Sequence, residues 1–214
     1  MYILTYKKCR KTDKIIYRIP TFYFTIYSIY GIDKVVYDKW DASNNSEFQK
    51  ACQTKYELCD AKRLLKYGYG ICWDQVELER DWFINNDYEC KTFFIWFCFS
   101  TSNNYVTHTY LVYKDKKTEK YCYFEHSDDA NKGIKEFDSY KDAILYQMKK
   151  HIDFNKSIGN LIDEDVLSHL QVYEFEIEKY GCSQYEYMEN ILNSKLVYNN
   201  NKFVTEINVC KSKN

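Results

Sequence analysis

The hydrophobic and polar positions of this chain first predict two consecutive helices. Apolar side chains such as Phe48, Cys52 and Cys59 recur at helical spacing, which predicts a helix from about 47 to 66. A second helical pattern runs from about 71 to 83 and has apolar groups on more than half of its circumference. We therefore expect the second helix to be central and mostly buried.

Strand patterns follow the second helix. Residues 92–99 are nearly all apolar, residues 107–113 alternate between apolar and polar, and residues 121–125 are aromatic with polar flanks. Other patterns predict two short strands within 14–30, a helix from 139 to about 151, a strand over 173–178, a helix over 183–195 and a last strand over 203–209. Helices followed by a run of antiparallel strands indicate the α+β class.

Length and composition limit the number of domains and the kinds of partner. A chain of 214 residues with 45% hydrophobic content fills one core and is too short for two ordinary domains, so we expect a single domain over 1–214. Lysine and arginine number 30 against 31 acidic residues, and the net charge of -1 gives no field that would attract a phosphate backbone or an anionic membrane. We therefore expect neither a nucleic acid nor a membrane as partner.

The expected location follows from the first residues and the cysteines. The first ten residues lack the features of a secretory signal, and the most apolar segment, 92–99, is far shorter than a bilayer requires. We expect a soluble, cytoplasmic protein. The nine cysteines are an odd number at irregular spacing with no Cys-x-x-Cys pair, which argues against a disulfide framework and a zinc ribbon. Most of them are expected to be reduced core residues.

Cys72 is the cysteine whose position indicates chemistry. It opens the predicted central helix shortly after Gly68 and Gly70, where unpaired backbone N–H groups stabilise a thiolate. The same N–H groups can bind the oxygen that becomes negative when a thiolate attacks an amide carbonyl. Cys72 is therefore the candidate nucleophile.

The neighbours of Cys72 are candidates for substrate contact. A side chain at Gly70 would crowd a substrate backbone that approaches the thiol, and Trp73, Asp74 and Gln75 follow the thiol directly. The acidic residues of this helix are otherwise expected on its solvated side: Asp74, Glu77, Glu79 and Asp81.

A cysteine nucleophile needs an imidazole base in contact with it, and His108 is the best placed of the four histidines. It stands at the start of an alternating strand, with Tyr110 and Val112 on its own side. His151 at the end of a predicted helix and His169 in a polar segment are expected at the surface. Because a short charged turn joins this strand to the next, a carboxylate after that turn can reach the imidazole and fix its tautomer, the candidates being Glu125 and Asp128.

Three segments resemble the transglutaminase-like branch of the papain-like cysteine enzymes: Gly70 to Asp74, Thr107 to Tyr113 and Tyr121 to Ser127. In that family a Gly-x-Cys-Trp segment opens the central helix, a histidine begins a strand and an acid ends the adjacent strand. The resemblance implies a cysteine-bearing central helix packed on an antiparallel sheet. It also implies a catalytic core at about 46–152 and a C-terminal extension at about 153–214.

By this resemblance Cys72 is the nucleophile, His108 the base and acid, and Glu125 the orienting carboxylate. The family usually has aspartate in the third position, so Asp128 is the reserve candidate. The family's second oxyanion donor lies upstream of the cysteine, where two side chains are open candidates: Trp40 and Gln53.

The function expected on this basis is a cysteine-dependent hydrolase of amide, isopeptide or peptide bonds. Thiolate attack expels the amine with a proton from His108, and water or a second amine then resolves the thioester. The substrate would be a protein or peptide, and the reaction needs no cofactor and no metal.

Two other classes stay open. A metal-dependent hydrolase could use His108, Glu125, His126 and Asp128 as ligands for zinc or iron, although adjacent strand residues point to opposite faces. The scaffold could also serve without its chemistry, as a non-catalytic binding or regulatory protein, for example in conflict between a phage and its host.

Overall fold

An antiparallel sheet forms the centre of the protein. The computed structural model describes residues 56–67, 71–98, 105–125, 133–157, 159–176 and 179–204. Within these residues the sheet has seven strands in the order β4-β3-β2-β1-β5-β6-β7, and all neighbouring pairs are antiparallel. The strands are β1 (Cys90–Cys98), β2 (Tyr105–Lys114), β3 (Tyr121–Glu125), β4 (Gly133–Phe137), β5 (Gln171–Phe175), β6 (Lys195–Asn199) and β7 (Lys202–Phe203).

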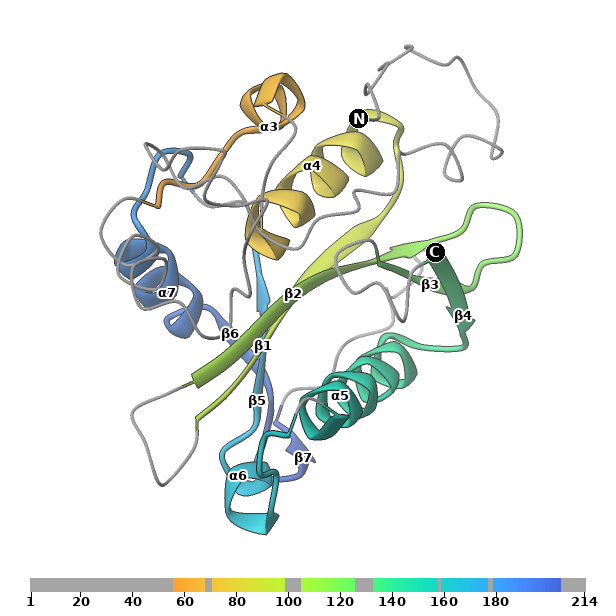
Figure 1. The fold of residues 1–214 in the computed structure, drawn as a ribbon. Helices are drawn as coiled ribbons and strands as arrows, with labels where there is room; N and C mark the ends of the chain where they lie inside the picture. The colour runs from red at the N-terminus through yellow and green to blue at the C-terminus, as the bar shows by residue number, and fades with distance from the viewer. Residues whose placement is uncertain are drawn as a thin grey trace.

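Helices lie on both sides of this sheet (Figure 1). One side carries α3 (Ala61–Tyr67), α4 (Cys72–Asn85) and α7 (Gln184–Leu192). The other side carries α5 (Tyr140–Ser157) and α6 (Glu164–Ser168). The mixture of helices with an antiparallel sheet confirms the α+β class that the sequence predicted.

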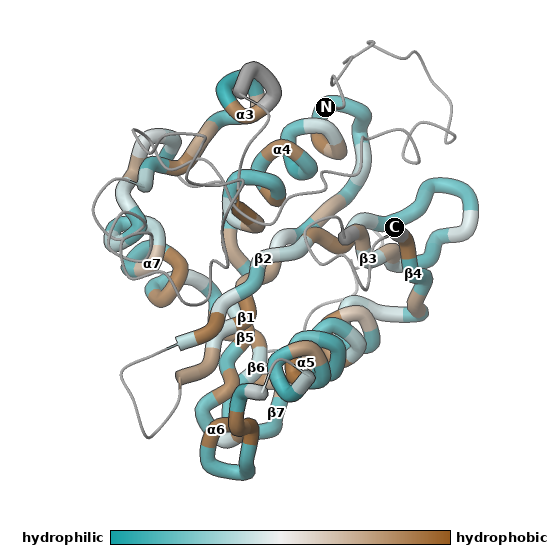
Figure 2. The backbone as a smooth tube through the Cα atoms, in the orientation of Figure 1, coloured by the Kyte–Doolittle hydropathy of each residue, from teal (hydrophilic) through white to brown (hydrophobic). Residues whose placement is uncertain are grey.

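Alternation along the strands divides the interior into two hydrophobic cores. The α5-side core contains Ile95 of β1 and Val112 of β2, packed with the inner face of α5. The α4-side core contains Phe94 of β1 and Leu111 of β2, packed with residues of α4 and α7 that include Trp73. In Figure 2 brown, apolar stretches alternate with paler and teal ones along the strands between the two helical layers.

The central helix and the first three strands agree with the sequence pattern. The predicted helix over 71–83 is α4, whose start is capped where the Ile71 N–H donates to Asp74 Oδ2 at 2.9 Å. The three apolar or alternating runs are β1, β2 and β3. The Ser139 cap of α5 is also present, with the Asp142 N–H donating to Ser139 Oγ at 3.2 Å.

The helix predicted from 47 to 66 is wrong over 56–60, and 47–55 lies outside the described residues. The helix α3 begins only after Asp60, whose carboxylate accepts a hydrogen bond from the Arg63 N–H at 2.6 Å. Before that point, Glu57 forms an isolated antiparallel bridge with Ser183. Pairing with a distant segment has overridden the helical spacing of the apolar residues.

The C-terminal part differs in two strands. The sequence analysis did not predict β4 or β6. β4 is a short edge strand that contains charged residues. β6 follows directly on α7, and the predicted helix was extended to Lys195, where β6 begins. The last predicted strand, 203–209, is seen only at its beginning, as β7, because 205–209 lies outside the described residues. The strands predicted within 14–30 also lie outside the described residues. β5 pairs with β1, so the residues beyond 153 complete the same sheet.

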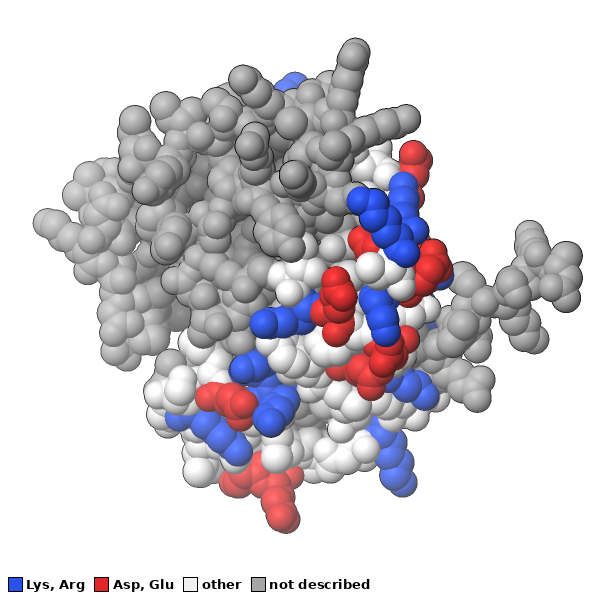
Figure 3. Space-filling view, turned by 90° about the vertical axis from the view of Figure 1, so that its right-hand side faces the viewer, with Lys and Arg blue, Asp and Glu red and all other residues white. Residues whose placement is uncertain are grey.

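Part of the described surface carries charges of both signs. The charged turn predicted between β2 and β3 is present, with Asp115 Oδ1 accepting from the N–H groups of Lys117 and Thr118 at 2.9 and 2.8 Å. Lysine and arginine alternate with acidic side chains over the face drawn in Figure 3. Among the described helices, none combines the length and apolar character needed to cross a bilayer.

Candidate functional site

Cys72 is the first residue of α4, as the sequence predicted. Its thiol is partly exposed and packs at the margin of the α4-side core. Because α4 lies over β2 and β1, Cys72 stands at a helix start above one face of the sheet.

His108 lies in β2, opposite Ile95 of β1, and only 7% of it is exposed. Its ring is nearly parallel to that of His151 in α5, with ring centroids 5.7 Å apart and an angle of 17° between the planes. On the strand it stacks beside Tyr110, with centroids 6.3 Å apart. These contacts place the imidazole against α5.

The sheet therefore separates Cys72 from His108. Strand alternation sends Thr109 and Leu111 towards α4, whereas His108 and Tyr110 point towards α5. The sequence correctly assigned His108 and Tyr110 to one side of the strand, but that side faces the wrong helix for a contact with the thiol. The expected contact between sulfur and imidazole is not formed in the structure.

His151 was expected at the surface and is instead buried. The reason is that α5 continues to Ser157, so His151 lies well inside the helix and on its inner face with Gln147 and Asn155. The Asn155 side-chain amide donates to the His151 carbonyl oxygen at 2.8 Å. His169, by contrast, is exposed as predicted.

Six other predicted site residues lie, wholly or with their side chains, outside the described residues. Glu125 ends β3, but its side chain lies outside the described residues, and so do Trp40, Gln53, Gly70, His126 and Asp128. In the parts of the chain that the structure describes, no three side chains of histidine, cysteine, aspartate or glutamate are grouped to hold a metal ion.

Trp73, Asp74 and Gln75 are buried. The Trp73 indole stacks on the Tyr187 ring of α7, with centroids 4.4 Å apart and 12° between the planes. The Asp74 carboxylate accepts hydrogen bonds from three neutral donors, which are the Tyr56 hydroxyl at 3.0 Å and the N–H groups of Cys59 at 2.8 Å and Ile71 at 2.9 Å. These side chains join α4 to neighbouring segments and do not face solvent, where a substrate would approach.

Burial dominates the electrostatics of Asp74. Removal from water raises the pKa of its carboxyl to about 6, although the hydrogen bonds from Cys59, Ile71 and Tyr56 and the charge of Arg63 act in the lowering direction. Burial also raises the pKa of the Tyr56 phenol, and the nearby Asp74 charge adds to that effect.

A buried ion pair on α4 was missed by the sequence interpretation. Glu77 Oε2 lies 2.5 Å from Arg80 Nη1, and the guanidinium also donates to the Thr92 hydroxyl of β1. Asp74 and Glu79 are buried as well, so the expectation of a solvated acidic side is wrong for Asp74, Glu77 and Glu79. The spacing of three residues between Glu77 and Arg80 was the available signal, because side chains at that spacing meet on a helix.

Among the other described cysteines, Cys59, Cys122 and Cys182 are buried and fit the expected role of core residues, whereas Cys90 and Cys98 are partly exposed. All six cysteines in the described residues are free thiols. Burial raises the pKa of the thiols of Cys90 and Cys122 to about 11 in both cases, which disfavours the thiolate.

The chain matches no family model, no curated protein and no solved structure. Its class is therefore defined by its own geometry. It is an α+β protein with an antiparallel sheet between two helical layers. A partly exposed cysteine lies on one face of this sheet and a buried histidine pair on the other.

Proposed function

We propose that this protein is a non-catalytic binding or regulatory protein. The position of His108 on the face of the sheet opposite Cys72 carries the proposal. A general base must come within about 3 Å of the proton that it removes, or act through one water molecule. An imidazole packed against α5 does not meet this condition for a thiol beside α4.

Exposed tyrosines offer contact chemistry for such a role. Tyr185 of α7 is 74% exposed and Tyr105 at the start of β2 is 42% exposed. The Gln184 side-chain amide donates to the Tyr105 hydroxyl at 3.1 Å, so the two elements meet at this surface. Tyrosine is enriched at protein interfaces because it combines a broad apolar ring with a polar hydroxyl. A protein or peptide is the class of partner that this surface favours.

Thiol reactivity tests the absence of an activated nucleophile. Iodoacetamide alkylates thiolates, and the rate at each cysteine can be followed by peptide mass spectrometry. We expect Cys72 to react at neutral pH at a rate similar to that of the partly exposed Cys98, and we expect His108→Gln to leave that rate unchanged. Alkylation of Cys72 about tenfold or more faster than that of Cys98 would overturn the proposal.

A cysteine-dependent hydrolase of the transglutaminase-like kind is the second candidate. One observation favours it, namely that a partly exposed thiol occupies the first position of a helix of 14 residues. In this case the base is a residue other than His108. Hydrolysis of a peptide or isopeptide that is lost in Cys72→Ala and retained in His108→Gln would support this candidate. Equal activity of Cys72→Ala and the wild type would exclude it.

A further inference from the structure

The helix α7 carries apolar side chains on two different sides. Tyr187 and Ile191 are completely buried in the α4-side core and fix its inner side. Tyr185 and Leu192 are 74% and 38% exposed, and helical geometry places them within about 20° of each other around the axis and about 120–140° from the buried pair. Single exposed apolar residues are common, but two on one line of a surface helix, where polar residues are expected, indicate a contact surface.

This contact surface extends from α7 to β2. Met188 is partly buried and lies on the flank of α7 between its inner side and the line of Tyr185 and Leu192. On the same flank the Gln184 side-chain amide donates to the Tyr105 hydroxyl at 3.1 Å, which brings a 42% exposed tyrosine of β2 beside the start of α7. We call Tyr105, Tyr185, Met188 and Leu192 the α7 surface. It belongs to the side of the sheet that also carries α3 and α4 (Figure 1).

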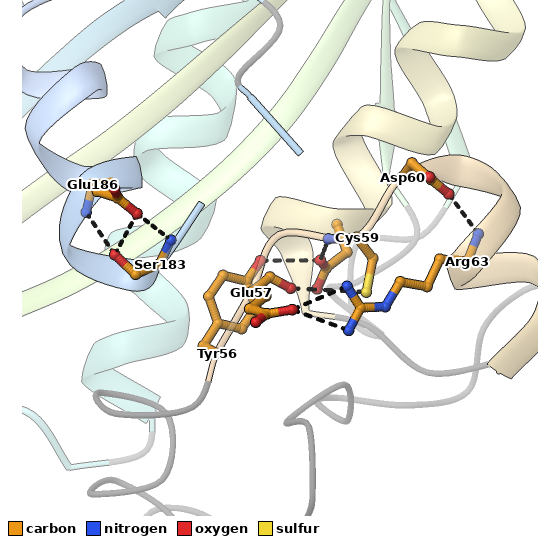
Figure 4. Close-up of polar contacts among 8 residues, drawn as sticks. Tyr56, Glu57, Cys59, Asp60, Arg63, Ser183 and Glu186 are labelled. Atoms are coloured by element: carbon orange, nitrogen blue, oxygen red, sulfur yellow. Dashed lines mark hydrogen bonds and ion pairs between the residues drawn. The ribbon is translucent and has the colours of Figure 1, made fainter. Parts of the chain in front are cut away.

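Acidic side chains border the α7 surface. The helix contains Glu186 and Glu189 and neither lysine nor arginine. The Glu186 carboxylate is held at the helix start, where it accepts hydrogen bonds from the N–H and the hydroxyl of Ser183 at 2.8 Å each (Figure 4). Glu189 lies one turn after Tyr185 and pairs with no cation in the part of the chain that the structure describes. Glu189 is therefore the carboxylate that is left to pair with a cation of a partner.

We propose that the α7 surface docks a short amphipathic helix of another protein, whose apolar side chains contact Tyr185 and Leu192 and whose lysine or arginine pairs with Glu189. This inference rests on the binding role proposed above and names the kind of partner.

The backbone of α7 favours a helical partner over an extended one. The peptide groups of a helix are hydrogen-bonded within it, so α7 offers no strand edge along which an extended peptide could form a ladder. A partner helix satisfies its own backbone groups and presents apolar side chains one and two turns apart on one face. This spacing matches the two turns that separate Tyr185 from Leu192.

The size of the surface favours a short segment over a second copy of this chain. α7 has 9 residues, which gives a length of about 14 Å. A stable protein interface buries about 800 Å² on each partner, which is more than one helix of this length offers. We therefore expect weak, reversible binding of a peptide-sized partner.

Selection from a displayed library of random peptides, about 16 residues long, tests the proposal with the full-length protein as target. The enriched peptides should be rich in lysine and arginine and have apolar residues at helical spacing. A synthetic copy of the most enriched peptide should gain helix on binding, as measured by circular dichroism. It should bind Tyr185→Ala and Leu192→Ala about tenfold more weakly than the wild type, and Glu189→Lys about fivefold more weakly.

Two exposed residues outside the α7 surface provide matched controls. Ile84→Ala on α4 removes exposed apolar area, and Asp153→Lys on α5 makes the same charge change as Glu189→Lys. Both should bind the peptide within about twofold of the wild type. Equal urea midpoints for all variants would show that differences in binding do not arise from unfolding.

The possible failures are distinguishable. Acidic or extended binders, no enriched peptide, or a peptide whose affinity is unchanged in Tyr185→Ala and Leu192→Ala would overturn the docking site. A peptide that binds with unchanged affinity in these variants would still agree with the binding role, which the alkylation rate of Cys72 tests separately. Dimerisation of the wild type that is lost in Tyr185→Ala, measured by sedimentation, would identify a second copy as the occupant and overturn the proposed partner.

Discussion

The Tyr123 hydroxyl donates a hydrogen bond to the side-chain carbonyl of Gln147 at 2.9 Å, inside the α5-side core. The hydroxyl of Tyr110, whose ring lies beside that of Tyr123, is also buried, and it has no hydrogen-bond partner within the described residues. The two tyrosines thus share a buried environment, but only the hydroxyl of Tyr123 forms a hydrogen bond.

Replacing each of these tyrosines by phenylalanine should give different results. Tyr123→Phe leaves the Gln147 carbonyl without its donor and is expected to lower the free energy of unfolding by about 1–3 kcal/mol. Tyr110→Phe removes a hydroxyl that forms no hydrogen bond there, and is expected to leave stability within about 0.5 kcal/mol of the wild type or to raise it. Urea denaturation measures both, and equal losses would contradict the assigned hydrogen bonding.

The stacked pair of Trp73 and Tyr187 should make a large contribution to stability. Trp73→Ala removes a buried indole that contacts Tyr56, Phe94 and Tyr187, and is expected to lower the free energy of unfolding by about 3–5 kcal/mol. Tyr185→Ala on the exposed side of α7 is the control and should change stability by less than about 0.5 kcal/mol. A loss below about 1 kcal/mol for Trp73→Ala would show that Trp73 is not a core residue.

The buried ion pair of Glu77 and Arg80 predicts a non-additive result. Arg80→Met removes the ion-pair partner of a buried carboxylate and should cost about 3–5 kcal/mol in stability. Adding Glu77→Gln to that variant should recover part of the loss, because it removes the buried charge that has lost the Arg80 guanidinium. The exposed pair of Lys114 and Glu119 provides the control, where Glu119→Gln should cost less than about 1 kcal/mol. Additive effects of the two buried changes would argue against the pairing.

Glu174 predicts a loss of stability in acid. Partial burial pushes the pKa of Glu174 upward, but hydrogen bonds from the ammonium groups of Lys195 and Lys91 outweigh this and bring the pKa below its ordinary value of 4.5. The stabilisation is therefore present above about pH 4.5 and is lost as the pH falls through the lower pKa of the folded state. Glu174→Gln should show a smaller drop in unfolding free energy between pH 7 and pH 3 than the wild type. An equal drop in Glu174→Gln and the wild type would contradict this role of Glu174.

Elements with strong local patterns were predictable from the sequence. The segment that begins at Cys72 has apolar groups around most of its circumference, and it is the central, buried helix α4. The relative sides of His108 and Tyr110 on β2 were also predictable, because strand alternation is a local property. Local rules fix which residues share a face.

What could not be predicted is which helix covers each face. That choice depends on packing between segments far apart in the sequence, and it placed His108 against His151 of α5 and not under Cys72 of α4. The burial of Glu77 has the same origin, since its partner Arg80 also contacts Thr92 of β1. Propensity and spacing carry no information on such contacts.

The insertion of β5 between β1 and β6 has a consequence for synthesis on the ribosome. β1 is the most apolar strand of the sheet. One of its edges pairs with β5, residues 171–175, which are synthesised only after β2, β3, β4, α5 and α6, so that edge stays unpaired until then. The unpaired backbone groups at the edge of an apolar strand can form hydrogen bonds with strands of other chains, which leads to aggregation. Pairing between strands far apart in the sequence is slow, so this edge stays exposed for longer. A nascent or truncated chain that ends before β5 is therefore expected to aggregate or to need a chaperone, and to yield no smaller folded domain.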